Sequence, residues 1–310
     1  MKITEILAER QPCFSFEFFP PKNDDGVAAL MQTAAALRPL NPAFVSVTYG
    51  AGGTTRARTL SVVKAMKHEL AMEAMAHLTC VGSTVDGLRG ILRELESAKF
   101  DNVLALRGDP PRGGTFAPTP SGLSHASDLT RLICTEFPFC VGGACYPEVH
   151  VEAENAAADL KFLSEKVEAG AQFLITQLFF ENERYYAFVE RARRAGIGVP
   201  IIPGIMPITN IAQVERFTSL CGATIPQRLR DELALRRDDP EAVLDLGVAY
   251  ATLQCVDLLA AGVPAIHFYT LNKSPAARAV VSALLAAKPW DRPAGRRYFG
   301  SLEVMDWAGK

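Results

Sequence analysis

The segment FSFEFFPP, Phe14–Pro21, places one carboxylate among aromatic side chains. On a strand, the alternate phenylalanines share one face, and Ser15 and Glu17 share the other. A buried carboxylate is paired, hydrogen-bonded or protonated, because loss of water penalises its charge, and the protonated form suits a general acid. From this segment alone, a catalytic Glu17, a paired core glutamate and an exposed edge residue all stay open.

Polar residues recur at the carboxyl ends of the other predicted strands. Each has a structural explanation when taken alone: His77 as a core histidine, Arg107 with Asp109 as a loop salt bridge, and Gln177 as an amide lining a barrel. In barrels of alternating strands and helices, however, such residues meet at one end. Together they predict one polar mouth, formed by Glu17, Thr48, Tyr49, His77, Thr79, Arg107, Asp109, Tyr146, His150, Gln177, Tyr269, Asn272 and Lys273.

The predicted helix Glu152–Ala169 carries Asp159 and Lys166 about two turns apart, which places both on one face. Two interpretations stay open for this pair. One is a solvated helix surface, and the other is contact with a ribose and a phosphate, with Lys166 as a point charge.

Several reaction classes lack their sequence signals. There is no GxSxG segment for a serine hydrolase, and the five histidines are dispersed, without HxH or HExxH. The seven cysteines form no CxxC pair, so neither a disulfide framework nor a metal site is predicted. The segment GAGGTT, 50–55, lacks the GxGxxG spacing and is interpreted as a glycine turn. The remaining polar set suits a site that binds a planar cofactor and supplies one proton.

Eight predicted strands alternate with helices, which indicates a single (β/α)8 TIM barrel with parallel strands; a doubly wound open sheet is the alternative. The strands are predicted at 14–21, 44–51, 74–80, 102–109, 139–147, 172–180, 200–207 and 265–272. The helices are predicted at 26–37, 55–70, 85–98, 125–136, 152–169, 183–195, 211–220, 227–236, 240–261 and 275–287. The barrel takes residues 1–310 as one domain, with a C-terminal tail at 288–310 and a mobile loop at Pro110–Pro120.

The composition is that of a globular protein: 49% of the 310 residues are hydrophobic and 21% are charged. A net charge of −2 without a basic run argues against a nucleic-acid partner. The N-terminus does not resemble a secretory signal, and no apolar run is expected to approach the length of a membrane span. We therefore expect a cytoplasmic protein without membrane contact.

A series of motifs resembles the methylenetetrahydrofolate reductase family, in the short bacterial form that consists of the catalytic barrel alone. They follow the family's order from about residue 14 to 287: FSFEFFPP, VSVTYGAGG, AHLTC, LALRGDPP, ACYPEVH, ADLKFLSEKVEAG, FLITQLFF, IIPGIMPI and HFYTLN. The resemblance implies a flavoprotein that passes a hydride from NADH or NADPH to FAD, and from FAD to 5,10-methylenetetrahydrofolate, giving 5-methyltetrahydrofolate. One flavin face serving two substrates implies ping-pong turnover, and the family places the reaction in one-carbon metabolism and methionine biosynthesis.

The resemblance also implies residue roles. Glu17 is the general acid that helps to open the five-membered ring of the folate, and Asp109 lies beside the flavin and the folate. The folate-side positions are Gln177, Gln213, Phe217 and Lys273, with Phe217 stacking on the bound substrate. FAD contacts are implied for Thr48, His77, Arg107, Gly108, Asp109, His125, Ala126, Tyr146, His150, Asp159 and Lys166.

Four positions depart from the bacterial pattern. Phe162 and Glu165 stand where the bacterial pattern has Asn and Arg near the flavin phosphates, which predicts weaker binding of FAD. Lys273 replaces an arginine fork by a point charge. His125 stands where Tyr is common, after a longer loop.

Three functions therefore remain to be distinguished. The favoured one is the FAD-dependent reductase. The others are a relative that moves hydride directly from nicotinamide to folate, and a pterin-binding barrel that transfers methyl groups without redox chemistry. The choice between NADH and NADPH, the physiological direction of the reaction and the formation of a homo-oligomer through the tail are left open by the sequence.

Overall fold

The protein is described by a computed structural model covering residues 1–21, 23–48, 53–109 and 119–291. Its strands form one parallel sheet in the order β7-β6-β5-β4-β3-β2-β1-β9-β8. They are β1 (Cys13–Phe18), β2 (Phe44–Val47), β3 (Ala74–Thr79), β4 (Asn102–Leu106), β5 (Cys140–Cys145), β6 (Phe173–Thr176), β7 (Ile201–Ile202), β8 (Gly204–Ile205) and β9 (Ala265–Tyr269).

One barrel position is made of two short strands. β7 pairs with β6 through Ile201, while β8 pairs with β9 through Gly204, and Pro203 separates the two. Proline has no N–H to donate to a strand partner, but its carbonyl accepts a hydrogen bond from His267 N at 3.0 Å. The sequence predicted a single strand here. The interrupted strand closes the sheet, so the predicted (β/α)8 barrel is confirmed.

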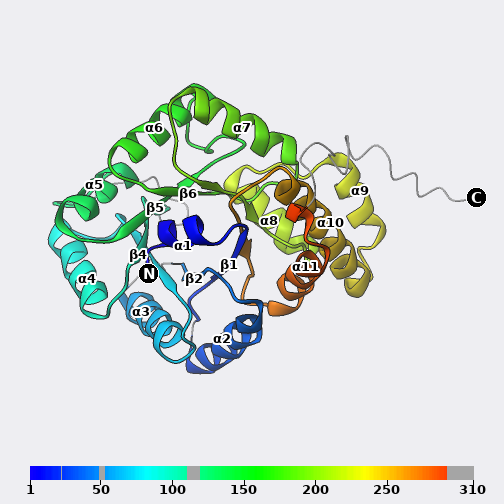
Figure 1. Ribbon diagram of the computed structural model, residues 1–310, viewed down its shortest axis with the longest axis horizontal. Helices are drawn as coiled ribbons and strands as arrows, with labels where there is room; N and C mark the ends of the chain where they lie inside the picture. The colour runs from blue at the N-terminus through cyan, green and yellow to red at the C-terminus, as the bar shows by residue number, and fades with distance from the viewer. Residues whose placement is uncertain (22, 49–52, 110–118, 292–310) are drawn as a thin grey trace, which may run out of the picture.

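Helices surround the strands (Figure 1). They are α2 (Asp24–Leu37), α3 (Gly53–His68), α4 (Val85–Ser97), α5 (Ala126–Glu136), α6 (Ala156–Glu168), α7 (Asn182–Arg194), α8 (Ile211–Cys221), α9 (Gln227–Leu235), α10 (Pro240–Ala260) and α11 (Ser274–Ala287). The predicted helix at 152–169 begins later, at Ala156, because Asn155 caps it by accepting hydrogen bonds from two backbone N–H groups.

The first helix, α1 (Ile3–Glu9), was not predicted from the sequence. Its buried Ile3 and Ile6 pack with Phe44 and Met75, which project into the barrel. The N–H of Ile3 also donates to Asn102 Oδ1 at 2.8 Å, at the first residue of β4. α1 therefore covers the amino-terminal end of the barrel, and it lies at the centre of the ring in Figure 1.

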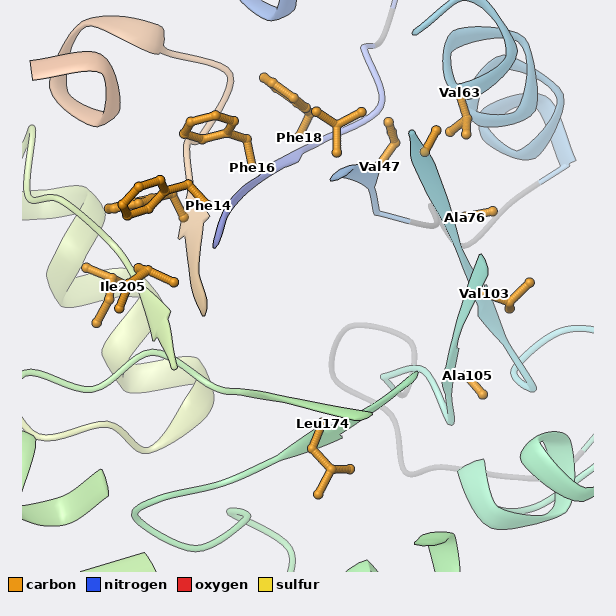
Figure 2. Packing of buried hydrophobic residues seen from close by; sticks show 14 of the residues in the cluster. Phe14, Phe16, Phe18, Val47, Val63, Ala76, Val103, Ala105, Leu174 and Ile205 are labelled. Atoms are coloured by element: carbon orange, nitrogen blue, oxygen red, sulfur yellow. The ribbon is translucent and has the colours of Figure 1, made fainter. Parts of the chain in front are cut away.

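The phenylalanines of β1 face the helices. Phe14, Phe16 and Phe18 are at most 4% exposed and belong to the main apolar core, together with residues of α2 and α11. Figure 2 shows them on the outer side of the strands, as it shows Val103 and Leu174 on other strands. The alternate residues Ser15 and Glu17 must then project into the barrel, and they share one face of the strand, as the sequence pattern predicted.

The helix α10, with 21 residues, is long and apolar enough to cross a membrane by length and composition. The expectation that no apolar segment reaches this length is therefore wrong. Its buried residues include Val243, Gly247 and Leu258, and 39% of its apolar window is buried inside the fold. This helix alone is weak evidence for a membrane.

The described residues hold no cluster of three or more His, Cys, Asp or Glu suited to a metal, and the cysteines are free thiols. Three predictions fall largely outside the described residues: the glycine turn of GAGGTT with Tyr49, the loop Pro110–Pro120, and most of the tail. The beginning of the tail is described, and there Trp290 packs against Phe14 with ring centroids 6.2 Å apart.

Candidate active site

Glu17 lies at the carboxyl end of β1, inside the barrel, and is 8% exposed. Its backbone carbonyl accepts hydrogen bonds from Thr270 Oγ1 at 2.6 Å and from Thr270 N at 3.3 Å, which joins the ends of β1 and β9. Its carboxylate Oε2 lies 3.4 Å from His267 Nε2 and 3.6 Å from His77 Nε2. The carboxylate is therefore held between two imidazoles.

His267 was missed as a site residue by the sequence reasoning. It is fully buried in the middle of β9, and its Nδ1 lies 2.7 Å from Ser15 Oγ. Its ring stacks on Phe44 and meets the edge of Tyr269. His267 lies in the middle of its strand, whereas the predicted site residues were those at strand ends. Alternation on β9, which places His267 on the same face as Tyr269, was the signal available in the sequence.

His77 is a neutral imidazole at physiological pH. Burial lowers its pKa from 6.5 to about 4; the charge of Glu17 opposes this shift, and His267 adds to it. Among the residues that the structure describes, His77 Nε2 has no partner within hydrogen-bonding distance.

Two hydroxyl groups beside Glu17 and His77 resemble His77 Nε2 in this respect. Ser46 Oγ and Thr79 Oγ1 are also buried without a hydrogen-bond partner within the described structure. Ser46 is paired with Glu17 across β1 and β2, and Thr79 follows His77 on the same face of β3. Buried polar atoms almost always bind a protein group, a water molecule or a ligand. These atoms therefore indicate a polar binding site beside Glu17.

A second group of predicted residues follows β4 and β5. The guanidinium of Arg107 donates to both carboxylate oxygens of Glu152, at 2.5 and 2.9 Å. This pair raises the pKa of Arg107 and lowers that of Glu152. Tyr146 and His150 meet edge to face, with ring centroids 4.6 Å apart. Glu152 had been assigned only to a helix, so its pairing with Arg107 is a finding of the structure.

Asp159 and Lys166 of α6 both turn toward β5 rather than to solvent. Asp159 Oδ2 accepts from the N–H of His150 at 3.2 Å, and Lys166 Nζ donates to Ala144 O at 2.5 Å. The lysine stem lies over Gly143, where a Cβ would be 2.6 Å from its Cδ. Burial lowers the pKa of Lys166 and raises that of Asp159. The interpretation as a solvated helix surface is therefore wrong.

The predicted folate-side residues come from the segments that follow β6, β8 and β9. Phe217, on α8, stacks on Phe19 with centroids 6.2 Å apart and an interplanar angle of 18°. Gln177 follows β6 and accepts from the N–H of Leu178 at 2.8 Å, and Gln213 lies in the first turn of α8. Lys273 is the N-cap residue of α11.

The remaining predicted residues follow β2 and β4 or lie at the start of α5. Thr48 follows β2, and its N–H donates to Phe18 O at 2.8 Å. Asp109 is exposed beyond β4, directly after Gly108, whose φ is +89°. His125 caps α5 and pairs with Asp128 at 3.3 Å, and Ala126 is the first residue of that helix.

The two residues of α6 that depart from the bacterial pattern, Phe162 and Glu165, are on the outer side of the helix. The side chain of Phe162 is 53% exposed. Glu165 lies 4.0 Å from Lys161, one turn earlier on the helix. In this structure Glu165 therefore interacts with a surface lysine.

Comparisons with a family model and with known proteins point to the same family. The family model of methylenetetrahydrofolate reductase matches residues 2–285. The chain is 40% identical over 284 residues to the 5,10-methylenetetrahydrofolate reductase of Escherichia coli (strain K12), covering 91% of this chain and 94% of that protein. It is 37% identical over 313 residues to methylenetetrahydrofolate reductase (NADH) 1 of Arabidopsis thaliana, covering 94% of this chain and 53% of the plant protein. The chain thus spans about half the length of this plant relative and nearly all of the bacterial one.

Solved structures share the fold at low identity. A Clostridium thermocellum protein that binds two copies of 5-methyl-5,6,7,8-tetrahydrofolic acid superposes with a TM-score of 0.64 at 16% identity, covering 93% of this chain and 99% of that one. The dihydropteroate synthase of Xanthomonas albilineans, in complex with 7,8-dihydropteroate, gives 0.51 at 14% identity, covering 89% and 93%. At these identities the likeness shows the barrel fold alone.

Proposed function

The chain belongs to the methylenetetrahydrofolate reductase family, and on that premise we propose that it reduces 5,10-methylenetetrahydrofolate to 5-methyltetrahydrofolate, with FAD as cofactor and NADH or NADPH as hydride donor. The observation that carries the proposal is the inward carboxylate of Glu17. It lies between two imidazoles and next to buried polar atoms that have no partner among the described residues.

Glu17 is suited to proton transfer at one atom of the folate. Opening the five-membered ring breaks the bond between N10 and the methylene carbon, and N10 takes a proton as the N5 iminium forms. Glu17 supplies that proton as general acid. Burial keeps His77 neutral, so at neutral pH its imidazole polarises the site without adding a second charge.

His267 orients the carboxylate. Ser15 occupies its Nδ1, which leaves Nε2 directed at Glu17 Oε2. This contact fixes the orientation of the carboxyl group inside the barrel mouth.

The residues around the mouth fit a flavin dinucleotide by the chemistry of their donors. Arg107 and Lys166 offer positive charge for the diphosphate, and Asp159 offers an acceptor for a ribose hydroxyl. Thr79 and His77 hold buried polar atoms that have no partner in the described part of the chain. Arg107 and Lys166 now contact Glu152 and Ala144 O, so phosphate binding would require an exchange or sharing of these partners. FAD, when bound, supplies the acceptor and donor of the hydride.

Phe217 supports turnover in which two substrates use one site in succession. It is stacked on Phe19, and an aromatic ring in this position can instead stack on a flat substrate ring. Nicotinamide and pterin are both flat, which agrees with a ping-pong order. The name of the Arabidopsis relative favours NADH as donor.

The deciding experiment is the visible absorption spectrum of the purified protein, followed by anaerobic addition of NADH and then of methylenetetrahydrofolate. We expect a yellow protein that bleaches with NADH and regains its colour with the folate. A colourless protein that oxidises NADH in the presence of folate, and is not stimulated by FAD, would support direct hydride transfer. Folate binding without nicotinamide oxidation would support the methyl-transfer barrel.

A further inference from the structure

The hydroxyl of Tyr269 crosses a break in the strand pairing of the barrel. β6 pairs with β7 through Leu174 and Ile175, and β8 pairs with β9. At Thr176, the last residue of β6, the part of the chain that the structure describes shows no strand pairing toward β7 or β8. Tyr269, the last residue of β9, reaches this point and donates a hydrogen bond to Thr176 O at 2.6 Å.

Side chains take the place of strand pairing at this break. The backbone N–H of Gly204, in β8, donates to Thr176 Oγ1 at 2.9 Å. A Cβ at Gly204 would lie 2.4 Å from Thr176 O and 2.7 Å from the hydroxyl oxygen of Tyr269. Glycine is therefore the residue that lets the tyrosine hydroxyl reach the carbonyl.

The carbonyl that Tyr269 binds belongs to the peptide group that joins Thr176 to Gln177. The N–H of the same peptide group, that of Gln177, donates to Cys145 O at the end of β5 at 2.7 Å. The planar group is therefore held at both ends, by β5 on one side and by Tyr269 on the other. The side chain of Gln177 begins at the next Cα, so these two hydrogen bonds fix where it starts.

The phenol of Tyr269 is a neutral donor in a fixed place. Burial, and then the negative charge of Glu17, raise the pKa of Tyr269 well above its usual value, so the hydroxyl keeps its proton at physiological pH. The ring meets His267 edge to face, with centroids 5.5 Å apart. This contact holds the ring independently of the hydroxyl.

We propose that Tyr269 is a positioning residue for Gln177, and that its hydroxyl strengthens folate binding by anchoring the Thr176–Gln177 peptide group. This inference rests on the proposed function and on the implied contact of Gln177 with the folate. Without the anchor, the glutamine has to be ordered when the folate binds, which lowers the affinity. The hydrogen bond involves no residue that is implied to contact FAD, so FAD binding should not depend on it.

The test measures the dissociation constant of 5-methyltetrahydrofolate for the FAD-loaded protein by isothermal titration calorimetry. Tyr269→Phe removes the hydroxyl and keeps the ring that meets His267. We expect this variant to bind the folate about five- to tenfold more weakly, the effect of one hydrogen bond, with an unchanged dissociation constant of FAD.

Tyr185→Phe is the matched control. It also removes a hydrogen bond from a phenol to a strand carbonyl, that from Tyr185 to Ile201 O at 2.8 Å. Tyr185 lies on α7, outside the strands, so this variant should leave folate binding unchanged. An equal weakening of folate binding in Tyr185→Phe would overturn the inference, because a general loss of stability would then explain both results.

A double-mutant cycle tests whether Tyr269 acts through Gln177. Gln177→Ala should itself weaken folate binding, and adding Tyr269→Phe should then have little further effect, because both changes remove the same contribution. Additive losses in the double variant would overturn the route through Gln177. Unchanged folate affinity in Gln177→Ala would overturn it as well.

The remaining outcomes separate the inference from the proposed function. An unmodified protein that binds neither FAD nor the folate overturns both. An unmodified protein that reduces methylenetetrahydrofolate, with unchanged folate affinity in Tyr269→Phe, overturns the inference alone. Equal weakening of FAD and folate binding in Tyr269→Phe also overturns it, because that result indicates a purely structural role.

Discussion

The carboxylate Oε2 of Glu17 lies 3.4 Å from Nε2 of His267, although the two residues are 250 positions apart in the chain. Barrel closure makes β1 and β9 neighbours, with Ser15 directly opposite His267. The hydroxyl of Ser15 then meets the other nitrogen of the imidazole at 2.7 Å. The strand register thus places the imidazole of His267 between the side chains of Ser15 and Glu17.

Replacing Glu17 by Gln should separate the two half-reactions. Gln keeps the size of the side chain but cannot act as a general acid. We expect reduction by NADH to continue and the folate step to slow by about 10²–10⁴-fold. Stopped-flow absorbance of the bound flavin measures both rates. Two unimpaired half-reactions would show that Glu17 is not the general acid.

Replacing Ser15 by Ala should leave Nδ1 of the buried His267 without its partner. An unsatisfied buried group costs about 1–3 kcal/mol of folding free energy. We also expect a slower folate step, because the imidazole is no longer fixed toward Glu17. Urea unfolding and the rate of the folate step test this. Ser97→Ala, at an exposed serine of α4, is the control, and equal behaviour of the two variants would contradict the role of Ser15.

Protonation of His77 should destabilise the fold in acid. Its pKa is about 4 in the folded protein against an ordinary 6.5, so the unfolded chain binds more protons between these values. The contribution of neutral His77 to the free energy of unfolding is complete above about pH 6.5 and falls as the pH decreases. Below about pH 4 the free energy of unfolding is lower by about 3 kcal/mol. Urea unfolding from pH 7.5 to 4.5 should show a shallower loss for His77→Gln than for the unmodified protein. His68→Gln, at an exposed histidine, should retain the steep loss.

Asp109→Asn should change two properties together. If Asp109 lies beside the flavin, as the family resemblance implies, removing its negative charge raises the flavin midpoint potential and alters folate affinity. Redox titration and folate titration measure the two effects. Asp86→Asn, at a side chain that is 92% exposed on α4, is the matched control. A variant with both properties unchanged would remove Asp109 from the site.

Gly247→Ala should displace the segment that leads into α8. A Cβ at Gly247 would lie 1.8 Å from Ile208 O, an impossible contact with backbone. We expect a loss of about 1–3 kcal/mol in unfolding free energy. A Cβ at the helical Gly90 meets nothing within 4 Å, so Gly90→Ala should instead stabilise by about 0.5–1 kcal/mol. Thermal unfolding of Gly247→Ala and Gly90→Ala tests this prediction. Equal stability of the two variants would mean that α10 does not pack closely against Ile208.

The alternation of strands and helices, the common face of the phenylalanines of β1 and the polar strand ends could be predicted from the sequence. These features depend on periodicity and on residues close together in the chain. Closing the strands then brings polar ends such as Glu17 and His77 to one mouth. The order of motifs, in the same way, was sufficient to indicate the family.

Other features depend on contacts that local sequence does not encode. α1 has only 7 residues and is stabilised by burial of Ile3 and Ile6 in the barrel, since so short a helix is not stable alone. The partners of Glu17 and Arg107 were likewise not predictable, because His267 and Glu152 reach them only through strand register and loop placement. The sequence by itself determined the barrel and the carboxylate inside it. Only the tertiary structure decided which groups surround that carboxylate, because these pairings form between residues that the chain keeps far apart.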